Sequence, residues 1–504
     1  MLAVIHREPC VDTNRAGGSW VHRKGMQSSG AESIIWPSAL RLLFLYLFGF
    51  FVMASTMALM QPHYAEAPYF AGPPDEHARL LLPMYICEHG VIPTGLEEEI
   101  RIPGYGFSYG LYNVFPYIVQ GYAMRLASLF TDSLELLIYV ARFVNVFFGT
   151  CMAWVVYRLA GRLFEDARIR WIFCVGVMFL PECLFVHTYV NTDSMNLLST
   201  AMIVYAWVCA YQDGFNRKND LWLSAGIILC ALSYYNAYGF ILSSIFLLLG
   251  YFVERRQGRL AYDWKNMLKH GLLISVLVLL GIGWWFARAY LVLDGDFLGL
   301  RTRRELAIRY ALPEVNPLNQ VTYQSRGISL FQMFRETDFW NNTFNTFVAA
   351  FGSLSILGSV WIYRFYKVFY GGAALACMVL PAKDSDGISH RGKRLFFKSQ
   401  MLFSIVCVFA LMIIYAYTID MQRQGRYLLP AVVPVYYFLT RGIEKGFSLS
   451  FIPKWMKTVG TILLLVALAG ICAWMIYGVS LPVFKIVNDM ELAKAGVLME
   501  VFYG

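Results

Sequence analysis

Charged residues are scarce in this sequence of 504 residues. They make up 15% of the chain, whereas hydrophobic residues make up 58% and the mean hydropathy is +0.51. A soluble domain carries about 25% charged residues, so this composition excludes a soluble enzyme and a disordered chain. The apolar runs are also too long for the short alternating strands of an outer-membrane barrel. The predicted fold class is therefore an all-α polytopic membrane protein.

Several other signals are missing from the sequence. The ten cysteines follow neither a disulfide pattern nor a metal-ligand spacing, and most of them lie in apolar runs. No P-loop, nucleophile elbow, zinc motif or Rossmann fingerprint is present. The net charge of +9 does not indicate nucleic acid as a partner. The excess Lys and Arg stand in short segments between apolar runs, as the positive-inside rule requires.

The apolar runs predict about eleven spans with the N-terminus inside. They lie near residues 39–60, 140–162, 171–189, 193–211, 221–235, 239–253, 272–292, 354–380, 397–418, 427–441 and 458–479. The run 354–380 carries Arg364 and Lys367 in its middle. We interpret it as one span, but two spans there would reverse the side of every later loop.

This threading divides the chain into a cytoplasmic tail (1–38), a transmembrane domain (39–480) and an extracytoplasmic C-terminal tail (481–504). The first extracytoplasmic loop covers 61–139 and contains an interfacial helix near 111–130, and the second covers 293–353. The expected location is the cytoplasmic (inner) membrane. The polar residues that topology does not explain gather on the extracytoplasmic side, so we expect any chemistry there.

The densest group of polar residues is PPDEHARLLLPMYICEHGVIP in the first outer loop. Asp75 follows two prolines, where a helix can begin. It is therefore either a helix N-cap or a catalytic base held above the membrane. Glu76, His77 and Arg79 stand beside it. Both interpretations of Asp75 remain open from the sequence.

Four arginines, Arg142, Arg288, Arg423 and Arg426, lie at predicted outer span ends. Each could be an interfacial anchor. Together they also suit a lipid-linked phosphate, because the planar guanidinium group binds phosphate oxygens in pairs. A further group comprises Glu182, His187, Asn191 and Asp193, of which the last two could simply cap a helix.

Six segments in the same order resemble the GT-C superfamily of membrane glycosyltransferases. They are PPDEHARLLLPMYICEHGVIP, GLYNVFPYIVQGYAMRLASLF, RFVNVFFGT, FLPECLFVHTYVNTDSMNLL, GWWFARAYLVLDGDFLG with SLFQMFRETDFWNNTFNTFVAAFG, and QGRYLLPAVVP. The resemblance covers roughly residues 39–445 and is to the smaller bacterial relatives of aminoarabinose and mannosyl transferases. It implies a GT-C-like helical domain.

The resemblance also implies a reaction. The donor is a sugar on undecaprenyl phosphate, the acceptor is an envelope glycan, lipid or protein, and Asp75 is the base of an inverting single displacement. Glu76 supports Asp75 or, in some relatives, binds a divalent cation. Otherwise no cofactor or metal site is expected. Arg79 joins the four span-end arginines as a phosphate-binding candidate. Aromatic residues of the first loop, including Tyr64, Tyr69 and Tyr109, suit stacking on sugars.

Two other functions remain open. A transporter or flippase for lipid-linked sugars is expected to carry charges at mid-membrane and internal repeats, and only Glu182 fits. A glycan ligase or polymerase is expected to carry its arginines in a large late loop.

Overall fold

The computed structural model describes residues 32–63, 71–112, 114–256, 259–381, 386–388 and 390–490, without the side chains of 32–38 and 254–260. Most of the predicted N-terminal tail, the end of the predicted C-terminal tail, Tyr64 and Tyr69 lie outside this part. The chain divides into two compact units, Met1–Leu45 and Tyr46–Gly504. The arrangement given below is that within Tyr46–Gly504.

Helices make up nearly all of the regular structure. The first half contains α1 (Glu32–Met60), α2 (Glu76–His89), η1 (Tyr109–Leu111), α3 (Phe115–Ala127), α4 (Leu134–Leu163), α5 (Ala167–Met178), α6 (Pro181–Phe185), α7 (Asp193–Asp213), α8 (Arg217–Ala231), η2 (Tyr235–Ala237) and α9 (Tyr238–Tyr251). The second half contains α10 (Trp264–Val292), α11 (Leu300–Tyr310), α12 (Leu330–Glu336), α13 (Phe339–Val348), α14 (Val360–Val379), α15 (Arg391–Thr418), η3 (Gly425–Ala431), α16 (Val432–Phe447), α17 (Lys454–Ala473) and η4 (Trp474–Ser480).

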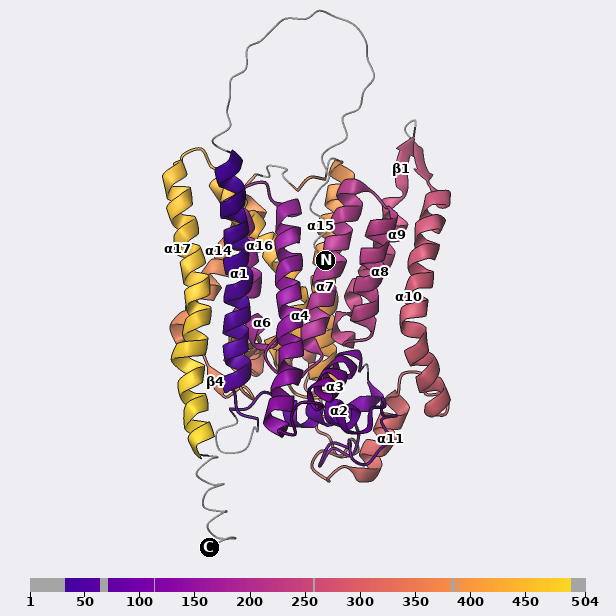
Figure 1. Ribbon diagram of the computed structural model, residues 1–504. Coiled ribbons are helices and arrows are strands. Elements are labelled where there is room, and N and C mark those ends of the chain that lie inside the picture. Colours follow the sequence, from indigo (N-terminus) through magenta and orange to yellow (C-terminus); the bar gives the residue numbers. More distant parts are fainter. Residues whose placement is uncertain are drawn as a thin grey trace, which may run out of the picture. The chain divides into compact units, whose positions relative to one another are not determined.

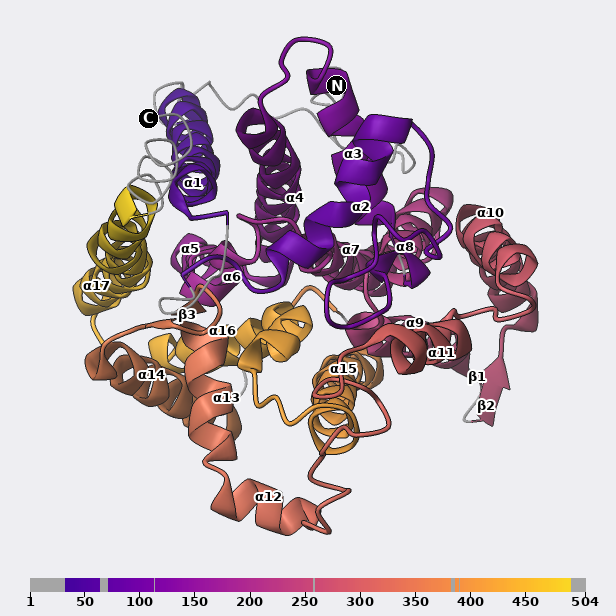
Figure 2. The ribbon, with the colours of Figure 1, turned by 90° about the horizontal axis from the view of Figure 1, so that it is seen from below.

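Two antiparallel hairpins are the strand structure of the described residues. β1 (Val253–Arg256) pairs with β2 (Arg259–Tyr262), and β3 (Ala350–Phe351) pairs with β4 (Ile356–Leu357). In Figure 1, β1 lies at one end of the long helices, whereas α2, α3 and α11 lie at the other. We call the second end the α2 end. It gathers the two predicted outer loops, and Figure 2 looks onto it.

Six helical segments of the described chain are long and apolar enough to cross a membrane. They are Ala39–Met60, Leu134–Leu163, Asp193–Asp213, Trp264–Val292, Arg391–Thr418 and Lys454–Met490. Each of the predicted spans coincides with one or two helices, but the count of about eleven is not confirmed. Several helices are short: α8 has 15 residues and α9 has 14. The predicted span 354–380 is one helix, α14, that begins only at Val360.

The helix α7 is the most enclosed of the six, with 94% of its apolar window buried. It packs against α4 and α8, and Asp193 is its first residue. The start of α7 therefore lies where α2, α4 and η3 come together at the α2 end. This meeting point carries most of the polar residues singled out above.

Candidate functional site

Asp75 stands at the N-cap position of α2 but does not cap the helix. Its φ of 59° lies in the left-handed region, and its side chain makes no hydrogen bond to the first turn. Asp tolerates this region better than most residues, yet such a conformation still costs on the order of 1–3 kcal/mol. The carboxylate is 52% exposed. The helix thus begins without using the one group that could cap it, and that group is left available.

Arg79 lies one turn along α2 and faces two carboxylates. Its guanidinium nitrogens are 3.7 Å from Asp75 Oδ2 and 3.9 Å from Asp193 Oδ2. These distances fit ion pairs but are too long for hydrogen bonds. The Arg79 side chain is only 11% exposed. It therefore places a fixed positive charge between the first outer loop and the start of α7.

Arg426 supplies a second buried cation from η3. It is 5% exposed, donates to the Tyr189 hydroxyl at 3.2 Å, and lies 5.6 Å from the centroid of the Tyr427 ring. Arg426 and Arg79 are close enough to repel each other, and Asp193 attracts Arg426. The Nε of each arginine is buried without a hydrogen-bond partner among the described residues. We call Asp75, Arg79, Asp193 and Arg426 the Asp75 cluster.

Aromatic rings of the first outer loop lie against this cluster. The Tyr109 ring centroid is 5.5 Å from the Arg79 guanidinium carbon, 6.3 Å from the Phe107 centroid and 6.0 Å from that of Tyr112. Burial raises the pKa of Tyr109 to about 12, although Arg79 opposes the rise. The Tyr109 hydroxyl therefore stays protonated at neutral pH.

Arg142 and Glu76, both predicted as site residues, instead bind each other inside the protein. The Arg142 Nε donates to Glu76 Oε1 at 2.9 Å, and its Nη2 donates to the other carboxylate oxygen. The remaining donors bind the carbonyls of Ala58, Gln61 and Pro62. A guanidinium has five N–H donors, so Arg142 has none left for a phosphate. The assignment of Arg142 to the phosphate site is corrected on this ground.

The other predicted cations lie apart from the Asp75 cluster. Arg288 donates to the carbonyls of Ile92 and Pro93 and stacks on Trp285. Arg423 is partly buried and makes no side-chain hydrogen bond or ion pair within the described chain. His77 is exposed on α2. None of the three is brought to Asp75 by a described contact.

The remaining candidates organise the turn before α7. Asn191 donates to the carbonyls of Val186 and Tyr189, and its Oδ1 accepts from the Ser194 amide at 3.0 Å. His187 is fully buried, with Nδ1 2.6 Å from Ser194 Oγ. Glu182 is buried and accepts from the Ala350 amide at 2.8 Å. Of the four residues in this group, Asp193 belongs to the Asp75 cluster, and Glu182 lies within electrostatic reach of Arg426.

Asp420 lies within electrostatic reach of Asp75 and was not anticipated from the sequence. Burial raises the pKa of Asp420, and the nearby Asp75 carboxylate raises it further, against the hydrogen bond from Gln422. Tyr105 is within electrostatic reach of both carboxylates. The only signal in the sequence was the position of Asp420 just before the quoted turn QGRY.

The Asp75 cluster does not fit a divalent cation. No group of three or more His, Cys, Asp or Glu side chains in the described residues could hold a metal ion. The space between Asp75 and Asp193 is taken by the guanidinium of Arg79. Positive charge at this site is therefore supplied by arginine.

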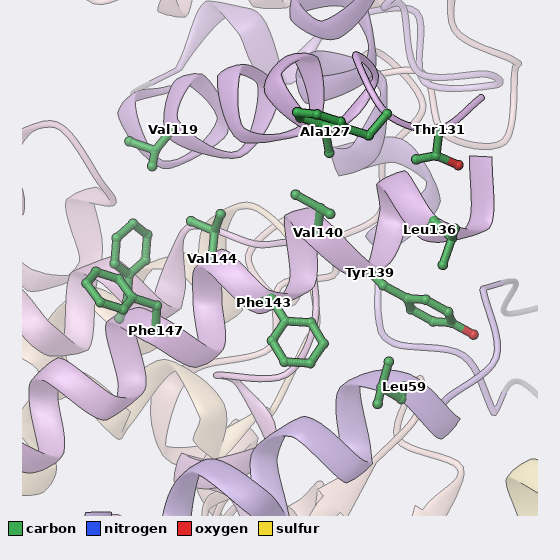
Figure 3. Close-up of a pocket in the computed structure, with 12 residues that line it drawn as sticks. Leu59, Val119, Ala127, Thr131, Leu136, Tyr139, Val140, Phe143, Val144 and Phe147 are labelled. Atoms are coloured by element: carbon green, nitrogen blue, oxygen red, sulfur yellow. The ribbon is translucent and has the colours of Figure 1, made fainter. Parts of the chain in front are cut away.

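A separate apolar groove of about 750 Å³ runs between α1, α3 and α4. In Figure 3, Tyr139 and Phe143 of α4 face Leu59 of α1, while Val119 and Ala127 extend from α3. No charged side chain lines the groove. It suits a hydrocarbon chain but offers nothing to hold a phosphate, so it does not contribute to the Asp75 cluster.

Solved structures with a similar fold include two membrane proteins. ArnT from Cupriavidus metallidurans, bound to undecaprenyl phosphate, has a TM-score of 0.50 and 11% identity, over 90% of this chain and 77% of that one. The archaeal oligosaccharyltransferase AglB from Archaeoglobus fulgidus, in complex with an inhibitory peptide and a dolichol-phosphate, has a TM-score of 0.45 and 13% identity, over 86% of this chain and 55% of that one. The chain thus spans about half the length of the oligosaccharyltransferase.

The likeness to ArnT concerns the fold alone, and at that level the resemblance to GT-C glycosyltransferases predicted from the sequence is confirmed. No curated protein matches the chain. Residues 97–435 match the family model DUF2142, described as a predicted membrane protein. Because this match covers more than half of the 504 residues, the protein belongs to the DUF2142 family of predicted membrane proteins.

Proposed function

We propose that this protein is a membrane glycosyltransferase. It transfers a sugar from a polyprenyl-phosphate donor to an envelope glycan, lipid or protein, with Asp75 as the base. The observation that carries this proposal is the state of Asp75: a half-exposed carboxylate, held in a strained left-handed conformation, that does not cap its own helix. Strain of this kind gathers at functional sites. The GT-C fold supports the same class of reaction.

The proposed step is a single displacement at the anomeric carbon. The acceptor hydroxyl gives its proton to the Asp75 carboxylate while its oxygen forms a bond to that carbon. The bond from the anomeric carbon to the phosphate oxygen breaks, and its electron pair leaves with polyprenyl phosphate. Attack opposite the leaving group inverts the anomeric centre. Because the departing phosphate is stable without a proton, one base suffices and no general acid is needed.

Arg79 and Arg426 are the proposed ligands of the donor phosphate. Each carries an Nε without a partner inside the protein, and their mutual repulsion falls when an anion binds between them. Guanidinium groups fixed in a buried place stabilise the charge that grows on the leaving phosphate. Glu76 and Arg142 act indirectly, by holding α2 against α4. No divalent cation is required by this step.

The proposed location is the inner membrane with the α2 end on the extracytoplasmic side. No nucleotide-binding motif is present in the sequence, which agrees with a donor that the membrane delivers already activated. The polyprenyl chain would lie in the bilayer while its phosphate reaches Arg79 on α2 and Arg426 in η3.

Mass spectrometry of envelope glycans and lipids tests this function. Cells that lack the gene should lose one monosaccharide from an envelope product and accumulate the monophosphate-linked sugar lipid. Restoring the gene should reverse both changes. Loss of a whole oligosaccharide with accumulation of a diphosphate-linked chain would instead identify a ligase. Accumulation of the donor on the cytoplasmic side alone would identify a flippase.

A further inference from the structure

We infer that Arg303 binds an anionic group of the acceptor, a phosphate or a carboxylate. This inference rests on the proposed function, because it assumes that Asp75 activates an acceptor hydroxyl nearby. Arg303 belongs to α11, in the second outer loop, and was not among the residues singled out from the sequence. It connects to the Asp75 cluster through packed aromatic rings.

The helix α11 packs against η1 of the first outer loop and shares an apolar cluster with the first turn of α2. Ala307 of α11 shares an apolar cluster with Ala78 of α2 and with Ile102 and Phe107. Ala78 is three residues from Asp75. Just after α11, the Leu312 amide donates to the Gly104 carbonyl at 2.8 Å. These contacts fix the position of α11 relative to the first outer loop, and Figure 2 shows α11 on the same end of the molecule as α2 and α3.

A glycine in the first outer loop shows how closely this loop approaches the end of α11. Gly106 has a φ of +74°, and a Cβ built on it would lie 2.6 Å from the Ala311 nitrogen. No other residue fits there without moving the two loops apart. The contact between the loops is therefore specific to this sequence.

Arg303 lies one turn before Ala307 and rests on two rings. Its guanidinium carbon is 4.5 Å from the Phe107 centroid and 5.0 Å from the Tyr112 centroid. The side chain makes no hydrogen bond or ion pair with any described residue, although the residue is partly buried. Cation–π contacts hold the position of a guanidinium without using its N–H donors. Arg303 is thus preorganised and still able to bind oxygen atoms.

Two nearby arginines, Arg301 and Arg101, differ from Arg303 in this respect. Arg301 is 3.9 Å from Glu305 and donates to the Asp294 carbonyl at 2.9 Å. Arg101 is paired with Glu98 at 3.3 Å. Both therefore have partners within the protein.

The charge of α11 supports an anionic partner. The helix carries Arg301, Arg303, Arg304 and Arg309 against Glu305, and 4 − 1 gives a net charge of +3. Arginine is depleted from loops on the outer side of a membrane. The proposed topology puts α11 on that side, so the positive-inside rule does not account for this charge.

The location of Arg303 assigns the anion to the acceptor. Arg79 and Arg426, the proposed phosphate ligands, lie in the first turn of α2 and in η3, just before α16. Arg303 lies on α11, a helix of 11 residues that is not among the six segments long and apolar enough to cross a membrane. Tyr112 lies within electrostatic reach of both Arg303 and Arg79, which places the aromatic rings between the two positive sites. A sugar that stacks on these rings would present its far side to Arg303.

Binding to the purified protein in detergent tests the inference. The protein is first saturated with undecaprenyl phosphate, which occupies the donor site, and is then titrated with glucose 6-phosphate, glucuronate and neutral glucose. We expect the two anionic sugars to bind at least about tenfold more tightly than glucose, as a charge-assisted pair would provide. Arg303→Gln should abolish the difference, and Arg303→Lys should recover part of it.

The matched control is Arg304→Gln, since Arg304 is exposed on the same helix and makes no side-chain hydrogen bond or ion pair within the described residues. It should bind the anionic sugars as the unaltered protein does. Equal affinity of Arg303→Gln and Arg304→Gln would overturn the inference. The inference would also be overturned if Arg303→Gln weakened binding of the anionic sugars only in the absence of undecaprenyl phosphate. Arg303 would then bind the phosphate of the donor. If sugar transfer still depended on Asp75, either of these two results would contradict the role of Arg303 but not the proposed glycosyltransferase function.

Discussion

Glu76 and Arg142 form a buried ion pair that ties the start of α2 to α4. Their side chains are 2% and 0% exposed, and Glu76 Oε1 also accepts from the Val190 amide at 2.8 Å. One carboxylate therefore fixes α2, α4 and the turn before α7. The adjacent acid, Asp75, is left half exposed. Two neighbouring acids in one motif thus differ in kind: one holds the structure, and the other is free to react.

Glu76→Gln should destabilise the protein strongly. Breaking a buried ion pair by removing one partner costs about 3–5 kcal/mol, because the remaining charge is left uncompensated. The measurement is the midpoint of thermal unfolding in detergent. The control is Glu98→Gln, since Glu98 is 89% exposed and pairs with Arg101 on the surface. That change should have almost no effect, and equal losses for the two variants would contradict the assigned role of Glu76.

Arg79→Lys and Arg426→Lys should each weaken binding of undecaprenyl phosphate by about tenfold or more. Lysine keeps the positive charge but loses the planar pair of donors that fits phosphate oxygens. Binding is measured by titration of the purified protein. Arg391→Lys, at the exposed start of α15, should bind normally. Normal binding by both of the first two variants would count against the phosphate site.

Asp420→Asn should stabilise the protein increasingly as the pH rises. The pKa of Asp420 is raised by burial and by Asp75, so its ionised form is disfavoured in the folded state. The resulting cost to folding is absent well below the ordinary aspartate pKa of about 3.9, where the carboxyl is protonated in both the folded and the unfolded state. It is complete above the raised pKa of the folded state. The asparagine variant lacks this cost. Its advantage in unfolding temperature should therefore grow from about pH 4 to pH 7, and a constant difference would exclude the effect.

The positions of the helices were largely predictable, because apolar runs mark membrane helices directly. The number of complete spans was not. Pro181 opens α6, and Pro430 lies within η3, so two of the predicted spans are each built from a broken pair of helical pieces. Local breaks of this kind do not interrupt an apolar run, and only the folded chain shows them.

The site was predictable to the level of the motif but not of each side chain. The sequence singled out Asp75, Arg79, Asp193 and Arg426, which the structure brings together. It could not separate them from Arg142, because whether a guanidinium is satisfied depends on carbonyls that a distant turn supplies. Asp420 and Arg303 were missed for a similar reason. Their significance depends on neighbours that are distant in the sequence, Asp75 for Asp420 and two aromatic rings for Arg303.

Thiol labelling in intact cells tests the proposed sidedness of the α2 end. A cysteine at exposed Asp132, between α3 and α4, should react with an impermeant reagent, and one at exposed Lys265, at the start of α10, should not. The reverse labelling pattern would place the site in the cytoplasm.

The most direct test of the central claim is sugar transfer by purified Asp75→Asn protein. The amide cannot accept a proton, so transfer should fall about 10²–10⁴-fold, while undecaprenyl phosphate still binds. Asp338→Asn is the matched control. Like Asp75, Asp338 stands at the N-cap position of its helix, makes no capping hydrogen bond and has a left-handed backbone, with a φ of 51°. It should transfer normally. Near-normal transfer by folded Asp75→Asn protein would contradict the account.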